Sequence, residues 1–486
     1  MAIESEQVRA IVERVLERLE TPDRAQGASE APQGSGEAYP LQLPESLSGA
    51  LPSAEEAVRA AGKAFDEFSN SPVELRESVV AAMRRAALAE AEKWARAAVE
   101  ETGLGRAEDK VKKNRLAAEK TPGVEALETF ARSGDRGLTI EELAPWGVAA
   151  AILPSTNPTA TVINNAISLL AAGNAVVFNP HPAAAKVTVE AVRRLNAAVV
   201  SAGGPANLLS TLSEPTVETA RELMAHPDVP LLVVTGGPGV VRAAFAAGKP
   251  VVAAGPGNPP VVVDETADIE KAARAIVEGA GFDNNIVCVD EKEIICVDSV
   301  ADELKEALAA KGALELPKKD WARLADTVLA KKGSPSEEGA PKKTYVGKDA
   351  SVLLTAIGNE GPAPRILFCE AGPEDPFLWT EQLMPAVPLV RVGSAEEAID
   401  LAKRVEGGRR HTAVMHSKNI EKLSKMAREM DCSIFVKNGP AIAGIGAGGE
   451  GHASFTIAGP TGEGVTSAAS FVRRRRCVLV DYFRIV

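Results

Sequence analysis

The chain has 486 residues, of which 45% are hydrophobic and 25% are charged, and its formal net charge is -12 with a pI near 5.2. This length allows two or three packed domains with sizeable cores. The acidic balance argues against a nucleic-acid or anionic-membrane partner, because either would call for a basic face. A small anionic ligand can still be held by helix N-termini, glycine turns and a few Lys or Arg residues.

The cysteines form no visible framework. The five are Cys288, Cys296, Cys369, Cys432 and Cys477. They include no C-x-x-C pair, and no His cluster stands at metal-ligand spacing, so we predict neither a disulfide framework nor a metal site. The N-terminus lacks the apolar segment of a signal peptide, and no charge-free apolar run is long enough to span a membrane. We therefore expect an intracellular protein with reduced thiols.

The first 50 residues differ from the rest of the chain. Residues 1–20 have apolar side chains at helical spacing between charged ones, which predicts a short amphipathic helix. The apolar positions are Val8, Ile11, Val12, Val15, Leu16 and Leu19. Residues 21–50 are rich in Pro, Gly, Ser and Ala and have too little apolar content to order themselves, so they are predicted to be a flexible linker.

Two helices are predicted next. The string SAEEAVRAAGKAFDEF opens on Ser53, a predicted N-cap with Glu56 placed as in a capping box. The string ELRESVVAAMRRAALAEAEKWARAAVEETG is a second helix, which Gly103 is predicted to end. Beyond Leu143 the apolar runs GVAAAILP, NAVVFNP, ANLLSTL and PLLVVTGG each precede a helical segment. Strands alternating with helices predict a parallel, doubly wound sheet.

The alternation resumes in a second α/β unit. Its predicted strands and helices lie in PPVVVDET, IEKAARAIVEGA, KEIICVDSVADELKEAL, PLVRVGSAEEAIDLAKRV and HTAVMHSKNIEKLSKMAREM. The polar segment LPKKDWARLADTVLAKKGSPSEEGAPKK is predicted to be a surface connection. The closing RRRRCVLVDYFRIV alternates apolar and polar residues, which indicates an edge strand or a strand that pairs with a partner.

Cys288 is the candidate nucleophile. It follows the Gly-rich helix end EGAGFDNN and precedes a predicted strand. A cysteine in a polar loop can be an accessible thiolate, whereas the ordinary alternative is a small buried hydrophobic residue. The flanking Asp283, Asn284 and Asn285 are poor core residues, and they favour the nucleophile.

Two further segments could complete a reaction site. Asn157, in ILPSTNPTATVINNAISLL, stands at a strand-to-helix junction where its amide could stabilise an oxyanion, although Asn before Pro is commonly a turn or an N-cap. In PLLVVTGGPGVVRAAFAAG a buried strand leads into Thr235, Gly236 and Gly237 and then a helix. This arrangement suits a phosphate, or it is a simple tight turn. No G-x-G-x-x-G fingerprint follows a predicted strand.

Together these segments resemble the aldehyde dehydrogenase superfamily. The resemblance is closer to its CoA-acylating branch, the propionaldehyde and acetaldehyde dehydrogenases of bacterial microcompartments, and it covers nearly the whole chain from Ser53 to Val486. It rests on ETGLGRAEDKVKKN, PSTNPT, NPHP, MAHPDV, TGGPG, AGPGNPPVVVDETADIEKAA, FDNN with its cysteine, EQLMP, HTAVMHS, VKNGP and GPTGEGVTSA.

The resemblance implies roles for individual residues. Cys288 resembles the family nucleophile, and Asn157 resembles the side chain that holds the oxyanion together with the Cys288 backbone N–H. Glu381 resembles the residue that positions the nicotinamide ribose. Asn179 stands where many hydrolytic relatives have a Lys, and His411 is assigned only an accessory role. The remaining dinucleotide-binding positions implied by the resemblance are Ile152, Pro154, Thr235, Gly236 and Gly237.

One missing residue separates the two branches of the superfamily. Hydrolytic members carry a Glu in the segment that matches AAGPGNPP, where it activates water against the thioester, but this segment has none. Asp264 and Glu265 follow the next strand and are poor substitutes. Without that base the acyl-enzyme can wait for coenzyme A. The resemblance thus implies NAD-dependent oxidation of propionaldehyde or acetaldehyde to an acyl-CoA, with the choice between NAD and NADP left open.

The resemblance also implies an architecture and partners. We expect an α/β protein with a Rossmann-type cofactor domain, a second α/β catalytic domain and a small β oligomerisation arm. The expected parts are the helix 1–20, the linker 21–50, the cofactor domain 51–256 with 121–142 in the arm and 440–462 returning to it, the catalytic domain 257–439, and the C-terminal oligomerisation strand 463–486. A homodimer or homotetramer is expected, with GLTIEELAP and the C-terminal strand pairing between subunits.

Residues 1–20 resemble the encapsulation peptides that dock cargo to shell proteins, which would place the protein in the cytoplasm inside a microcompartment. The alternative is a helix packed on its own domain or frayed in solution. Alternative functions are a hydrolytic aldehyde dehydrogenase that releases free acid, a relative that reduces an acyl phosphate, and an assembly protein without activity.

Overall fold

The computed structural model describes residues 43–361 and 363–485. The predicted helix 1–20 and most of the predicted linker 21–50 lie outside the described residues. The end of that linker differs from the prediction, because η1 (Glu45–Leu47) and β1 (Ala50–Leu51) are ordered elements. Ala50 is buried where β1 pairs with the edge of a sheet, which explains why the chain is regular here despite its Pro and Ser content.

A six-stranded parallel sheet forms the first half of the described chain. Its strand order is β1-β6-β5-β4-β7-β8. The strands after β1 are β4 (Val148–Ile152), β5 (Ala175–Asn179), β6 (Leu209–Leu212), β7 (Leu231–Thr235) and β8 (Val251–Ala254). Every residue of β4 and β5 is buried, as expected for strands covered by helices on both faces. The four apolar runs predicted to be parallel strands are confirmed.

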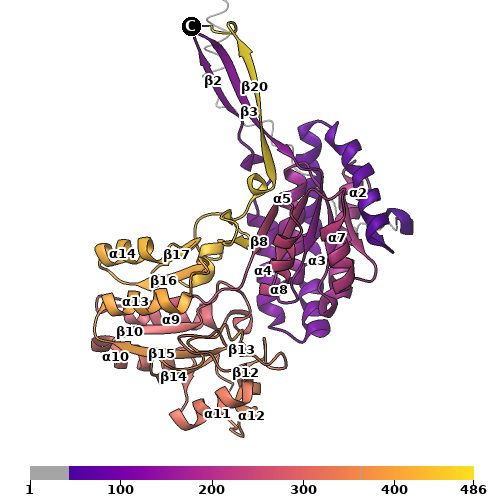
Figure 1. Cartoon of the computed structure of the whole chain (residues 1–486). Helices are drawn as coiled ribbons and strands as arrows, with labels where there is room; N and C mark the ends of the chain where they lie inside the picture. The colour runs from indigo at the N-terminus through magenta and orange to yellow at the C-terminus, as the bar shows by residue number, and fades with distance from the viewer. Residues whose placement is uncertain (1–42, 362, 486) are drawn as a thin grey trace, which may run out of the picture. The chain divides into compact units, whose positions relative to one another are not determined.

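Helices pack on this sheet, with α3 and α4 lying outside α5 and α6 (Figure 1). They are α2 (Ala54–Ser69), α3 (Val73–Thr102), α4 (Ala107–Lys120), α5 (Pro158–Ala171), α6 (Ala185–Ser201), α7 (Val217–Ala225) and α8 (Pro238–Ala246). The Ser53 hydroxyl caps α2 by accepting from the Glu56 N–H at 3.2 Å. The Glu56 carboxylate accepts from that hydroxyl rather than from the Ser53 N–H, so the capping box is incomplete. Gly103 ends α3 in the left-handed region with φ 66°, as predicted.

A seven-stranded sheet, also parallel, forms the second half, with the order β11-β14-β15-β10-β9-β16-β17. Its strands are β9 (Pro260–Val263), β10 (Glu293–Val297), β11 (Ala313–Glu315), β14 (Ile366–Ala371), β15 (Ala386–Val392), β16 (Thr412–His416) and β17 (Ile434–Lys437). Its helices are α9 (Ile269–Ala280), α10 (Asp298–Ala310), α13 (Ala395–Glu406) and α14 (Ile420–Met430). The predicted second α/β unit is confirmed.

The segment predicted to be a surface connection is instead structured. It contains α11 (Lys318–Val328), β12 (Leu329–Lys331) and β13 (Ala340–Pro341), and α12 (Ala350–Ala356) follows it. Trp321, Leu324 and Val328 of α11 are buried in a core of their own that includes Phe377. The prediction was wrong because the charged residues of α11 outnumber its apolar stripe, which nevertheless has helical spacing.

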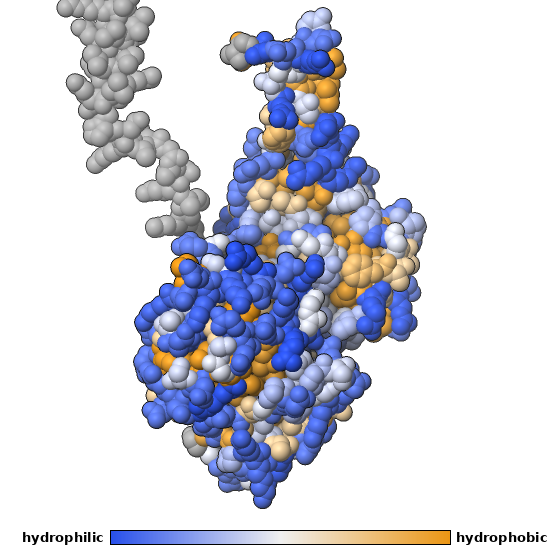
Figure 2. Space-filling view, turned by 60° about the vertical axis from the view of Figure 1, so that its left-hand side comes forward, coloured by the Kyte–Doolittle hydropathy of each residue, from blue (hydrophilic) through white to orange (hydrophobic). Residues whose placement is uncertain are grey.

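A three-stranded antiparallel arm extends from the two parallel sheets (Figure 1). It consists of β2 (Phe130–Gly134), β3 (Gly137–Pro145) and β20 (Val472–Val480), with β3 in the middle. Both edges of β3 are therefore filled within the chain, and the expectation that GLTIEELAP pairs between subunits is wrong. The predicted closing edge strand is confirmed as β20. Its residues Val478, Leu479 and Val480 are exposed. The surface of the arm has hydrophobic areas between hydrophilic ones (Figure 2).

Short elements complete the described chain. They are η2 (Val124–Ala126), η3 (Pro182–Ala184), η4 (Phe282–Asn285), η5 (Ala441–Ile445), η6 (Ala468–Ser470), β18 (Ile457–Ala458) and β19 (Gly464–Val465). No helix within residues 43–361 and 363–485 combines the length and the apolar composition needed to cross a membrane.

Candidate active site

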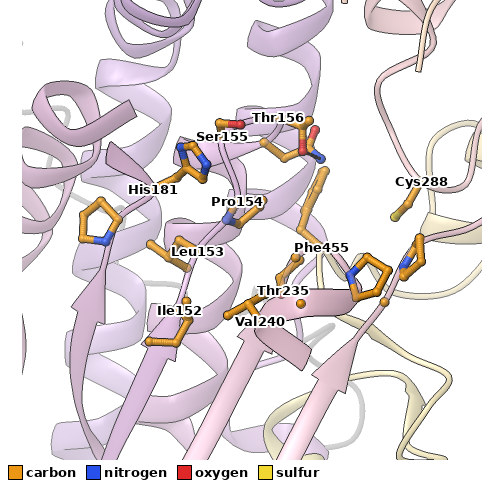
Figure 3. Close-up of a pocket in the computed structure, with 18 of the residues that line it drawn as sticks. Ile152, Leu153, Pro154, Ser155, Thr156, His181, Thr235, Val240, Cys288 and Phe455 are labelled. Atoms are coloured by element: carbon orange, nitrogen blue, oxygen red, sulfur yellow. Dashed lines mark hydrogen bonds between the residues drawn. The ribbon is translucent and has the colours of Figure 1, made fainter. Parts of the chain in front are cut away.

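A cavity of about 780 Å³ opens at the carboxyl ends of β4, β5, β7 and β8. This is the edge at which parallel α/β sheets bind ligands. All site residues predicted from the sequence line this cavity, namely Ile152, Pro154, Asn157, Asn179, Thr235, Gly236, Gly237, Cys288 and Glu381. In Figure 3, Cys288 projects from a loop across the cavity from the segment that includes Leu153 and Thr156.

The turn between β7 and α8 forms one wall. Pro238 is the first helical residue of α8, so the helix N-terminus lies directly beside Gly236 and Gly237. A Cβ atom on Gly237 would meet no atom within 4 Å, whereas one on Gly236 would lie 2.7 Å from Val240 Cγ1. The turn is therefore tight at Gly236 and open at Gly237, which leaves space for a phosphate to approach the backbone.

Asn179, predicted to bind the dinucleotide, also makes hydrogen bonds that hold neighbouring backbone in place. Its Oδ1 accepts from the Thr219 hydroxyl at 2.7 Å, and its Nδ2 donates to the Thr216 carbonyl at 3.2 Å and the Pro180 carbonyl at 3.4 Å. These bonds hold the N-terminus of α7 at the rim of the cavity. Both N–H groups of the amide are used, so only an oxygen lone pair is left for a cofactor.

Asn157 precedes the first turn of α5, but its side chain does not cap the helix. Its Oδ1 accepts a hydrogen bond from Lys113 Nζ instead. Its Nδ2 donates to Thr156 Oγ1 at 3.2 Å. The amide therefore has a second N–H that can point into the cavity, as an oxyanion donor would require.

The segment before Cys288 is not the polar loop that the sequence suggested. Asp283, Asn284 and Asn285 are buried, at 0%, 1% and 0% exposure. Their φ angles of 45°, 58° and 63° are left-handed, which Asn and Asp tolerate better than most residues. Asn285 Nδ2 donates to the carbonyls of Ala280 and Glu291, both at 2.8 Å. These residues were predicted to be poor core residues, which is wrong, because hydrogen bonds satisfy their polar groups inside the protein.

Cys288 is half-buried and unpaired by any disulfide. Burial and, to a smaller extent, the Glu381 carboxylate raise the pKa of the Cys288 thiol to about 12, while Lys292 acts in the opposite direction. The expected accessible thiolate is therefore corrected to a thiol at neutral pH. Its reactivity depends on what removes that proton.

Few carboxylates are placed where they could activate water beside Cys288. The end of β8 carries Gly255 and Pro256 into the cavity and no acidic residue, in agreement with the sequence. Asp264 accepts from the Ser417 hydroxyl at 2.6 Å, and Glu265 pairs with Lys422. One carboxylate, Glu381, does line the cavity.

Glu381 is fixed by the fold. Its Oε1 accepts from the Gly257 N–H at 3.1 Å, and burial raises its pKa. The cavity thus contains one carboxylate, although the segment at the end of β8 provides none.

His411 lies behind the nucleophile. It is 1% exposed, and its Nδ1 is 2.9 Å from Thr412 Oγ1, while Nε2 has no partner among the described residues. Burial lowers the pKa of His411 to about 4, with Lys292 acting in the same direction, so the ring is neutral at physiological pH. A Cβ on Gly257 would lie 2.5 Å from the Cys288 carbonyl oxygen and 3.0 Å from His411 Cγ. Only glycine permits this close approach.

Sequence reasoning missed the charged residues that support the site. Lys110 and Lys113 are buried on one side of α4, and both contact Asp283. The available signal was their i, i+3 spacing in ETGLGRAEDKVKKN, which places both lysines on one face of a helix. Within residues 43–361 and 363–485, no group of three or more His, Cys, Asp or Glu side chains could hold a metal ion.

Comparisons with known proteins identify the family of the chain. Residues 48–332 match the aldehyde dehydrogenase family. The chain is 53% identical over 440 residues to acetaldehyde dehydrogenase (acetylating) EutE of Escherichia coli, covering 90% of this chain and 94% of that protein. Rhodopseudomonas palustris propionaldehyde dehydrogenase, solved with bound CoA and an acylated cysteine, is similar with a TM-score of 0.86 and 49% identity over 89% of this chain and 98% of that one.

A third solved structure is similar as well. It is a propionaldehyde dehydrogenase from the fucose utilisation bacterial microcompartment of Clostridium phytofermentans. The TM-score is 0.87 and the identity is 44%, over 90% of this chain and 100% of that one.

Proposed function

The chain belongs to the aldehyde dehydrogenase family, and we propose that Cys288 is the nucleophile with which it converts a short aldehyde into an acyl-CoA. It is a CoA-acylating aldehyde dehydrogenase, an oxidoreductase that uses a nicotinamide cofactor and CoA and acts through a cysteine thioester. The observation that carries the assignment of Cys288 is that it shares one cavity with Asn157 and the Thr235–Gly237 turn, while the end of β8 has no carboxylate.

The residues of the site divide the reaction between them. Cys288 Sγ, once deprotonated, bonds to the aldehyde carbon and converts the carbonyl oxygen into an oxyanion. Asn157 Nδ2 donates to that oxyanion, together with the Cys288 backbone N–H. Loss of hydride restores the C=O bond and leaves a thioester on Cys288. The CoA thiolate then attacks the thioester carbon, and Cys288 leaves as thiolate.

The cavity fits a nicotinamide dinucleotide. Gly237 leaves open space at the N-terminus of α8, where a phosphate charge is favoured. Thr235, Gly236, Ile152 and Pro154 line the same wall, and Glu381 would lie at the ribose of the nicotinamide. NAD, when bound there, supplies the hydride acceptor. NAD is proposed as the natural cofactor, and measured KM values for NAD and NADP would decide between them.

One assay tests the activity directly. Purified full-length protein should form NADH with acetaldehyde and propionaldehyde when CoA is present, and acyl-CoA should accumulate in equal amount. NADH formation at the same rate without CoA, with free acid as product, would favour the hydrolytic alternative, in which Glu381 would be the first candidate base. The ratio of kcat/KM for acetaldehyde, propionaldehyde and butyraldehyde would fix the preferred substrate.

Residues 1–20 are proposed to dock the enzyme to a microcompartment shell protein inside the cytoplasm. The support is the apolar stripe in their sequence and the similarity to a microcompartment dehydrogenase. Deleting residues 1–19 should leave kcat and KM unchanged and abolish co-purification with shells. Shell association that persists after the deletion would contradict the proposal.

The arm is proposed to form the interface of a homodimer or homotetramer. Its support is the edge of β20 that no strand of residues 43–361 and 363–485 occupies, and the exposed apolar side chains Val478, Leu479 and Val480. Sedimentation of the wild-type protein should give two or four subunits, and Val480→Lys should shift it toward the monomer. A monomeric wild-type protein would refute the proposal.

A further inference from the structure

Two buried lysines contact the segment of Asn157, the proposed donor to the oxyanion. Lys110 and Lys113 of α4 are only 2% and 1% exposed. A buried ammonium group is costly unless it is paired and fully hydrogen-bonded. Their partners therefore indicate what the two charges do.

Both lysines converge on Asp283 and on the segment that carries Asn157. Lys110 Nζ lies 3.0 Å from Asp283 Oδ2 and 3.0 Å from the Thr156 carbonyl oxygen. Lys113 Nζ donates to Asp283 Oδ2 and to Asn157 Oδ1. Asp109, a second buried carboxylate on α4, is instead bonded to Arg365 at 2.7 Å and to Lys112 at 3.0 Å. Two cations thus share one carboxylate next to the Asn157 amide.

We propose that Lys113 is a positioning residue that fixes the orientation of the Asn157 amide, an inference that rests on the proposed function. The two ends of an Asn amide have nearly the same shape, so packing alone does not decide which end faces the cavity. An ammonium group can only donate, so it accepts Oδ1 as a partner and rejects Nδ2. Lys113 therefore turns the donor end of the amide toward the cavity and polarises its N–H bonds.

The contact between Lys113 and Asp283 links the Asn157 amide to the loop of Cys288. Asp283 lies in the left-handed segment that leads into Cys288, and its Oδ1 also accepts from the Arg106 N–H at 2.6 Å. Gly105 permits this approach, because a Cβ there would lie 2.0 Å from Asp283 Oδ1. One carboxylate thereby holds both the loop of Cys288 and the lysine that orients Asn157, so the donor and the nucleophile keep a fixed relation.

The test uses two substitutions and a matched control. Lys113→Met removes the donor, Lys113→Gln keeps a neutral donor, and Lys112→Met changes the neighbouring lysine, whose side chain is 68% exposed. Lys113→Met should lower kcat for aldehyde oxidation about 10²-fold, the usual effect of losing one oxyanion donor. The KM for NAD should stay within about twofold, Lys113→Gln should recover part of kcat, and Lys112→Met should match the wild type.

Two further measurements separate positioning from general damage. The double variant Asn157→Ala with Lys113→Met should be no slower than Asn157→Ala alone, because the Arg106 N–H and Lys110 still hold Asp283 and the Cys288 loop when Lys113 is replaced. Alkylation of Cys288 by iodoacetamide forms no oxyanion, and its rate should be unchanged in Lys113→Met.

Three results would overturn the proposal. They are an unchanged kcat in Lys113→Met, additive losses in the double variant, or an equal fall in the alkylation rate. If Lys113→Met does not fold, the same comparisons with Lys113→Gln decide the matter. A wild-type enzyme that makes no acyl-CoA would instead refute the proposed function, whatever the Lys113 variants do.

Discussion

The two walls of the cavity are built by different physical means. The cofactor wall consists of the βα turn at Gly236 and Gly237, where the helix N-terminus and an absence of side chains provide the site. The Cys288 wall contains a run of buried charged residues. Asp283, Asp290, Glu291, Lys292 and Glu293 are all 0% exposed. A ligand that binds and leaves can be held by backbone shape, whereas a reacting atom needs a loop that cannot shift.

Lys292 shows how the buried charges hold that loop. Its Nζ donates to the Asn285 carbonyl at 2.7 Å, to Asn285 Oδ1 at 2.6 Å and to the Val287 carbonyl at 3.3 Å. Glu291 Oε1 accepts from the Ala441 N–H at 2.8 Å and so ties the loop to η5. Lys292 Nζ thus has three acceptors, and a buried group satisfied in this way favours a single conformation. The comparison therefore predicts that changes on the Cys288 wall affect chemistry and stability, and that changes on the cofactor wall affect binding.

Replacing the nucleophile should have the largest effect. Cys288→Ala should reduce aldehyde oxidation to background, because no other cysteine lines the cavity within the described residues. NADH formation in the presence of CoA measures this. Thermal unfolding should be nearly unchanged, and appreciable turnover by the variant would refute the assignment.

The pH dependence of Cys288 reactivity should span about three orders of magnitude. Burial, reinforced by Glu381, raises its pKa to about 12, so below that value the thiolate fraction grows as pH rises. Alkylation of Cys288 by iodoacetamide should increase about tenfold per pH unit from about pH 7 to about pH 10, without a plateau. The modified Cys288 peptide must be quantified by mass, because Cys477 is exposed and also reacts. A plateau near pH 8 would show that the thiol is activated in the free enzyme.

Removing the Lys292 ammonium group, which is bonded to Asn285 and Val287 in the loop before Cys288, should destabilise the protein. Lys292→Met leaves the Asn285 oxygens and the Val287 carbonyl without their donor, and breaking a buried charged contact costs about 3–5 kcal/mol. The free energy of unfolding in urea measures the loss. Lys319→Met, at an exposed position of α11, is the control and should change it by less than about 0.5 kcal/mol. Equal stability of the two variants would mean that the loop does not depend on its buried charge.

The smallest effect is expected on the cofactor wall. Gly237→Ala should leave stability unchanged, because its Cβ meets no atom within 4 Å. It should raise KM for NAD by about fivefold, equivalent to about 1 kcal/mol of weakened contact at the helix N-terminus. The alkylation rate of Cys288 should match the wild type. A changed alkylation rate would show that the two walls are not independent.

The same contrast explains what could be predicted from the sequence. The cofactor wall follows from local patterns, because an apolar run, the Thr235–Gly237 turn and a helix are consecutive in the chain. The Cys288 wall depends on partners distant in sequence, such as Lys113 and Asp283, which are 170 residues apart. Local polarity indicated a solvated loop there, and only the tertiary contacts show that Asp283 and its neighbours are buried and satisfied. The resemblance to a family located Cys288 but did not explain how the loop is held.

The central claim is that Cys288 carries an acyl group that waits for CoA. It is tested most directly by mixing the enzyme with propionaldehyde and NAD without CoA, then measuring NADH and the mass of the Cys288 peptide. We predict one rapid equivalent of NADH per active site and a propionyl group on that peptide, which added CoA removes as propionyl-CoA. Continuous NADH formation with release of propionate, and no acyl group on Cys288, would contradict the account.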